Sequence, residues 1–112
     1  MASAETQVNE LLVIAKSREI QRAMFAEASR KPTRAAPHFL AAAHMELVLA
    51  EDYAAAGQER LAFRSRLSAA SCLWKAGEVK RARALFNSFV KQYPAKAKII
   101  KNTVAELEGK QP

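Results

Sequence analysis

The sequence has little of several features that indicate secretion or catalysis. It contains one cysteine, Cys72, so no disulfide can form within the chain and nothing indicates an oxidising compartment. Its three glycines stand alone, which excludes a glycine-rich phosphate-binding loop. The N-terminus lacks the basic start of a signal peptide, and no apolar run approaches the length needed to cross a membrane. We therefore expect a cytoplasmic protein that does not enter membranes.

Side chains that carry chemistry are also sparse. His38 and His44 are six positions apart, whereas two zinc ligands on one helix need a spacing of three or four. Glu51 and Asp52 are adjacent and would point about 100° apart on a helix, which does not suit an acid–base pair. Cys72 lies in an apolar stretch typical of a buried, inert thiol. The sequence therefore predicts no metal site, no cofactor and no enzymatic activity.

What is present is typical of an all-α protein. Half of the 112 residues are hydrophobic, and helix-forming residue types are plentiful. Apolar residues recur at spacings of three and four, as on one side of a helix. Pro32 and Pro37 are expected to keep residues 29–37 as a loop, with Pro37 in the first turn of the next helix. The predicted fold is a single domain, residues 1–112, of five antiparallel stacked helices: about 5–29, 37–56, 58–76, 78–93 and 95–108.

One part of the sequence resembles a known repeat. The pattern Gly77-x4-Ala82-x3-Phe86-x7-Pro94 is similar to the second half of a tetratricopeptide repeat. The stretch Leu49–Ala62 resembles the first helix of such a repeat and the turn after it. Gly57 and Gly77 are 20 positions apart, whereas the family period is 34. The helix between these two glycines would therefore belong to two hairpins. The resemblance implies irregular tetratricopeptide-like hairpins that act as a scaffold or adaptor for other proteins.

The positive charge is concentrated in the second half of the chain. Residues 60–101 hold 11 basic residues and one acid, giving +10, whereas residues 1–59 give −2. Such a block either keeps the surface solvated or attracts an acidic partner. Our first functional hypothesis is a non-enzymatic interaction module that binds an acidic protein or peptide. The candidate partner-binding residues are Arg60, Arg64, Lys75, Lys80, Arg83, Asn87 and Lys91.

The alternative hypothesis is binding of nucleic acid through phosphate contacts, which would be sequence-tolerant and steeply salt-dependent. The sequence shows neither a helix-turn-helix spacing nor exposed aromatic residues interleaved with the lysines, so this hypothesis ranks second. The residues that would contact phosphates are Lys80, Arg81, Arg83, Lys91, Lys96, Lys98 and Lys101.

Two further features predict tertiary contacts. The first predicted helix has an apolar run, residues 11–15, that covers most of its circumference. Such a helix needs cover on more than one side, either from other helices of the chain or from a second copy, which would make a homodimer.

Glu46 and Arg66 fall on otherwise apolar helix faces at similar distances from Gly57. An antiparallel hairpin would bring these two charges within about one turn, which predicts a structural ion pair. Alternatively, Arg66 would point into a groove and hold a partner's carboxylate.

Overall fold

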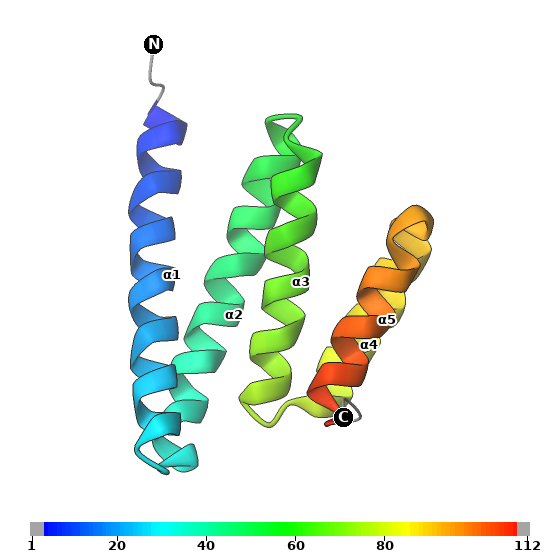
Figure 1. Ribbon diagram of the computed structural model, residues 1–112. Helices are drawn as coiled ribbons and strands as arrows, with labels where there is room; N and C mark the ends of the chain where they lie inside the picture. Colours follow the sequence, from blue (N-terminus) through cyan, green and yellow to red (C-terminus); the bar gives the residue numbers. More distant parts are fainter. Residues whose placement is uncertain (1–3, 110–112) are drawn as a thin grey trace.

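The computed structural model describes the backbone of residues 4–109 and the side chains from Glu10 onward. Within this range the chain forms five α-helices and no strand, so the all-α prediction is confirmed. Successive helices run antiparallel (Figure 1). Their bounds are Ala4–Ala28 (α1), Pro32–Ala55 (α2), Glu59–Lys75 (α3), Val79–Gln92 (α4) and Ala97–Leu107 (α5), and a short 3-10 turn, Pro94–Lys96 (η1), precedes α5.

The helices stack mainly in chain order. α2 lies between α1 and α3, and α3 also packs against α4 and α5. In the part of the chain that the structure describes, the backbone of α1 approaches closely only α2, so α1 forms one end of the stack. The expectation that α1 lies between other helices of its own chain is therefore wrong. One side of α1 faces solvent, and packing against a second copy of the chain stays a prediction.

A continuous core extends from α1 to α5. Phe39, Leu49, Leu73, Phe86 and Ile100 are the largest side chains with almost no exposed surface. Many other buried positions are alanines, whose small side chains let helix backbones approach closely. The hydrophobic spacing of α4 correctly predicts its buried face, since the α4 phenylalanines are both in the core. Packing against this shared core is what stabilises helices that would be marginal in isolation.

The first three turns between helices, after α1, α2 and α3, share one hydrogen-bonding pattern. Gly57 and Gly77 have φ angles of 75° and 91°, in the left-handed region that favours glycine. After α3, the Gly77 N–H donates to the Trp74 carbonyl, and the next N–H donates to the Leu73 carbonyl. These two bonds define a Schellman motif. The turn after α1 has the same pattern, but the left-handed position is held by Arg30, with φ 57°.

The predicted loop of residues 29–37 is too long. α2 begins at Pro32, so Pro37 lies inside the helix, although the other predicted bounds are within two residues of those observed. Pro32 is suited to the first helical position because its missing N–H would have no helical partner there. Pro37 removes one hydrogen bond, to the carbonyl of Thr33, and both residues are exposed to water. At so exposed a site the loss of one helical hydrogen bond does not end the helix, which continues to Ala55.

Within residues 4–109, no helix combines the length and the apolar composition required to traverse a lipid bilayer.

Candidate protein-binding surface

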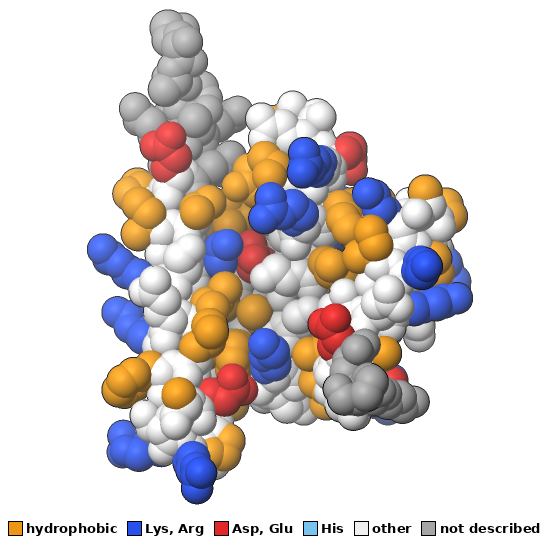
Figure 2. All heavy atoms as spheres, in the orientation of Figure 1, with side chains coloured by type: hydrophobic (Ala, Val, Ile, Leu, Met, Phe, Trp, Pro, Cys, Tyr) orange, Lys and Arg blue, Asp and Glu red, His pale blue; other side chains and the backbone are white. Residues whose placement is uncertain are grey.

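The outer surface of α1 is its exposed side, which extends from the face opposite α2 round to the edge that borders the first turns of α2. Leu11, Ile14, Arg18, Arg22 and Phe25 lie on it, because their spacings place them on one side of a helix. Leu11 is 69% exposed, Ile14 is 49% exposed and Phe25 is 75% exposed. Figure 2 shows apolar patches toward both ends of the outer edge of α1 and basic patches between them. This surface therefore combines exposed apolar area with positive charge.

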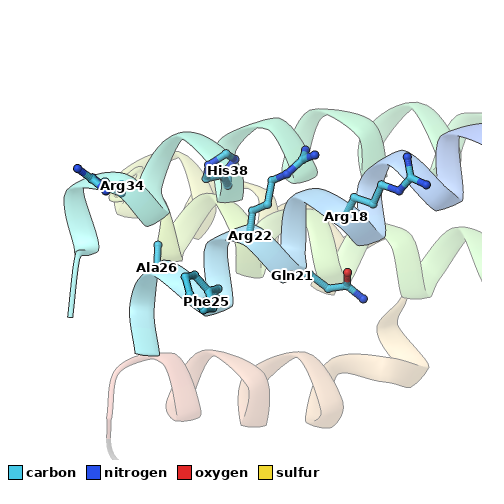
Figure 3. A pocket seen from close by; sticks show the side chains of 7 residues that line it. All are labelled: Arg18, Gln21, Arg22, Phe25, Ala26, Arg34 and His38. Atoms are coloured by element: carbon cyan, nitrogen blue, oxygen red, sulfur yellow. The ribbon is translucent and has the colours of Figure 1, made fainter. Parts of the chain in front are cut away.

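An open groove of about 580 Å³ adjoins this surface. It lies between α1 and the first turns of α2 (Figure 3). α1 contributes both arginines of its outer surface and the Phe25 ring, and α2 contributes Arg34 and His38. The groove is therefore mainly basic, with one large apolar side chain at its edge. The complete set of lining residues is Arg18, Gln21, Arg22, Phe25, Ala26, Arg34 and His38.

Glu19 joins the two helices beside this groove. Its carboxylate accepts a hydrogen bond from Arg22 at 2.9 Å and lies 2.6 Å from Nδ1 of His38. The hydrogen bond to His38 lowers the pKa of Glu19, and the nearby charges of His38 and Arg22 add to this effect against the opposing effect of burial. Arg22 and His38 thus both contact the Glu19 carboxylate. Arg18 and Arg34 have no ion-pair partner among the described residues.

The opposite side of α1 contains a buried charge pair. The Glu46 side chain of α2 is almost fully buried, and its Oε2 lies 3.5 Å from Nζ of Lys16. The other oxygen, Oε1, has no hydrogen-bond donor in the part of the chain that the structure describes. The predicted pairing of Glu46 with Arg66 is therefore wrong. The need for a cation was correct, but α1 supplies it, because Glu46 faces the interface with α1 as well as that with α3.

Arg66 lies on α3, the middle helix, and finds its partners on both sides of it. One guanidinium nitrogen donates to the hydroxyl of Tyr93, and another lies 3.5 Å from Oε1 of Glu51. Burial alone lowers the pKa of Arg66, but the hydrogen bond to Tyr93 and the contact with Glu51 raise it overall. The side chain thus links α3 to the end of α4. The alternative hypothesis was that the Arg66 guanidinium binds a partner's carboxylate, but contacts within the chain already engage this group.

The basic residues predicted to bind a partner lie on two helices and differ in their surroundings. Lys75 lies over the ring of Phe39, with Nζ 5.5 Å from its centroid. Arg83 stacks on Trp74 at 4.5 Å and its Nη2 is 2.7 Å from a carboxylate oxygen of Glu108. Both side chains therefore stabilise the fold. All seven residues are exposed, and the five without such a ring contact are Arg60 and Arg64 on α3 and Lys80, Asn87 and Lys91 on α4.

The residues predicted to contact nucleic acid divide in the same way. Lys96 lies 5.7 Å from the centroid of the Phe63 ring, so it is engaged within the chain, as Arg83 is. The exposed members for which the described residues show neither an ion pair nor a ring contact are Lys80, Arg81, Lys91, Lys98 and Lys101.

The outer surface of α1 was missed because charge was summed over a long segment. Residues 1–59 give −2, yet all six of their basic residues lie between Lys16 and Arg34, together with only two acids. That short segment has a net charge of +4. A narrower window would have located this second basic region. The burial of each side chain still had to come from the packing of α1.

Cys72, the free cysteine of the described range, is buried in α3. Burial raises the pKa of the Cys72 thiol, and the negative charge of Glu46 raises it further. The thiol is therefore held in its unreactive, protonated form. The described side chains, from Glu10 onward, include no group of three or more histidine, cysteine or acidic residues that could hold a metal ion.

Comparison of the chain with protein-family models, curated proteins and solved structures found no match.

Proposed function

We propose that the protein is a non-enzymatic interaction module that binds an acidic segment of another protein on the outer surface of α1 and in the adjoining groove. One observation carries the proposal. Among the described residues α1 packs against one other helix, yet it exposes four large apolar side chains, Leu11, Ile14, Met24 and Phe25. Terminal helices of stacked helical proteins ordinarily present a polar outer face to water. An end helix with an apolar outer face is typical of a surface that another molecule covers.

The composition of this surface suits a protein partner. Binding hot spots are enriched in aromatic and arginine side chains at positions that lose water on binding. Phe25 provides the aromatic side chain, and Arg18 provides a guanidinium without an ion-pair partner among the described residues. Part of the sequence resembles tetratricopeptide repeats. The antiparallel helices would support such a surface as hairpins do in that family.

The local charge favours an acidic partner over a second copy of the chain. Residues 16–34 have a net charge of +4, which would attract carboxylates. A symmetric antiparallel pairing of two α1 helices would bring Arg18 and Arg22 of both copies together. Like charges placed opposite each other weaken such an interface. A homodimer through α1 is therefore the less favoured arrangement, and a measurement of mass in solution at rising concentration tests it.

Selection from a peptide display library tests the proposal. The library is selected on the full chain and counter-selected on the Phe25→Asp variant. We expect enrichment of acidic peptides that bind the variant at least about tenfold more weakly, the loss typical of a hot spot. The matched control is Ile99→Asp, because Ile99 is an apolar residue on α5 that is 47% exposed and lies far along the chain from α1. Enriched peptides that bind both variants equally, or no enriched peptides at all, would reject the proposal.

A second candidate function is binding of nucleic acid by α4 and α5. It is favoured by the exposed basic residues of these helices that have no ion-pair partner in the described range, among them Arg81, Lys91 and Lys101. Titration of labelled single- and double-stranded oligonucleotides should then show affinity that falls steeply with salt. Charge reversal at Lys91 should weaken the binding. Absence of binding at low salt would remove this candidate.

A further inference from the structure

We infer that the partner segment is itself an amphipathic helix, with acidic residues in its centre and an apolar side chain toward each end. This inference rests on the proposed function and specifies the kind of segment that occupies the surface. It follows from the order of side chains along α1. Apolar residues lie at Leu11 and Ile14, arginines at positions 18 and 22, and the exposed ring at Phe25.

The dimensions of the surface match a second helix. Ile14 and Phe25 are 11 residues apart, which corresponds to about 16 Å along a helix axis at 1.5 Å per residue. A helix that crosses α1 at about 20° stays in contact over such a length. Its apolar side chains would therefore be about 11 positions apart, because both helices have the same rise per residue. Carboxylates three or four positions apart between them would face Arg18 and Arg22.

An extended segment fits this surface less well. Extended peptides gain affinity by adding a strand to an exposed sheet edge, where main-chain groups form hydrogen bonds. Residues 4–109 contain no strand, so this surface offers no sheet edge. A helix satisfies its main-chain groups internally and needs only side-chain contacts from its partner. The helical form therefore leaves fewer polar groups unsatisfied at the apolar ends of the surface.

The groove makes the two ends of the surface different. At one end, Phe25 borders the groove of about 580 Å³, which has room for a bulky apolar side chain of the partner. At the other end, Leu11 and Ile14 are one helical turn apart and form a flatter apolar patch. Arg34 of α2 lines the groove and extends the basic area beyond α1 (Figure 3). A further carboxylate near the bulky end of the partner helix would face Arg34.

Designed peptides test this inference with the full chain. The first peptide is a helix of about 20 residues that carries the predicted apolar and acidic positions on one side. The second has the same composition and helicity, checked by circular dichroism, but its apolar and acidic residues are distributed all round. By fluorescence anisotropy at low salt, we expect the first to bind at least about tenfold more tightly. Similar affinities for the two peptides would overturn the helix inference.

A charge exchange confirms the predicted contacts. The double variant Arg18→Glu/Arg22→Glu should bind the first peptide at least about tenfold more weakly. Replacement of the central acids of that peptide by lysine should restore binding to the double variant and weaken binding to the wild-type chain. Failure of this restoration would overturn the assignment of the central acids. Ile99→Asp should leave every affinity unchanged, because Ile99 lies outside the surface.

The experiments separate failure of the inference from failure of the proposed function. Display peptides that depend on Phe25, combined with equal affinities for the two designed peptides, would leave the acidic partner in place but overturn its helical form. No peptide that depends on Phe25 in either experiment would overturn both. A mass that doubles with concentration in the wild type, and not in Phe25→Asp, would assign the surface to a second copy and overturn the inference.

Discussion

The two ends of the helix stack are both basic, but they use their charges differently. At the C-terminal end, Arg83 stacks on an aromatic ring and pairs with a carboxylate, and Arg66 bonds to a tyrosine hydroxyl. At the N-terminal end, Arg18 and Arg34 have no ion-pair partner among the described residues and line a groove beside the exposed ring of Phe25. The C-terminal segment has the larger total charge. The comparison shows that the total charge of a segment does not reveal which of its cations lack an ion-pair partner among the described residues.

The largest effect is expected where α1 attaches to the stack. Lys16→Met would leave the buried Glu46 carboxylate without its cation, at a cost of about 3–5 kcal/mol. Thermal unfolding should show a fall in Tm of more than about 10 °C. Lys31→Met is the matched control, because Lys31 is exposed and has no ion-pair partner in the described residues. Equal Tm values for the two single variants would mean that the Lys16–Glu46 pair does not hold α1. The double variant Lys16→Met/Glu46→Leu should recover most of the lost stability.

The turns after α1 and α3 should respond in opposite directions to substitution. Gly77→Ala is expected to destabilise the protein by about 1 kcal/mol through its positive φ alone, because an added Cβ would meet no atom within 4 Å. Arg30→Gly should stabilise the protein by about 0.5–1 kcal/mol, because Arg30 holds the equivalent left-handed position. Denaturant unfolding measures both changes. A destabilising Arg30→Gly would show that the arginine makes a compensating contact.

Removal of single arginines tests the central comparison. Arg83→Ala should destabilise the protein by about 1 kcal/mol, because it removes both the stacking on Trp74 and the pairing with Glu108 at a partly exposed site. Arg18→Ala should leave the free energy of unfolding unchanged within error and weaken binding of an acidic peptide instead. Urea unfolding measures the first quantity and fluorescence anisotropy the second. The contrast between the ends would disappear if Arg18→Ala were the more destabilising change.

The smallest effect concerns pH and the contact between α1 and α2. The pKa of Glu19 is lowered in the folded protein, so its ionised form stabilises the fold fully above its usual pKa of about 4.3. This contribution is lost as the pH falls through the lowered pKa. Glu19→Gln should therefore reduce stability near neutral pH by less than about 1 kcal/mol, because the group is partly solvated. The difference in Tm from the wild type should shrink toward zero in acid, and a constant difference would contradict the role of its charge.

Features that depend on neighbours along the chain could be predicted from the sequence. The spacing of apolar residues identified α4 and its buried phenylalanines, and the two interhelical glycines identified the ends of α2 and α3. Pro37 was misleading because its local rule excludes proline from helix interiors, whereas an exposed first part of a helix tolerates the loss of one hydrogen bond. The sequence also showed no sign of the turn at Arg30, because a residue other than glycine holds the left-handed position there.

Contacts between distant helices could be predicted only in part. A charge at Glu46 on an apolar face indicated that a cation must lie nearby, and that was correct. Its identity was wrong because the hairpin argument considered α3 alone. Lys16 carried a usable signal, since it interrupts an inward-facing series that includes Ile20 and Ala23 at helical spacing. That signal identifies a buried lysine but not which carboxylate it meets.

By itself, the sequence determined the helices, most of their ends and the apolar side of α4, because helical hydrogen bonds and the 3.6-residue period join residues that are near neighbours in the chain. Only the tertiary structure decided that α1 lies at an end of the stack, that Glu46 meets Lys16, and that Phe25 faces solvent beside Arg18 and Arg34. These outcomes depend on which helix faces pack together. Which faces pack together depends on how the side chains of whole helices fit each other. A pattern among neighbouring residues does not specify this fit.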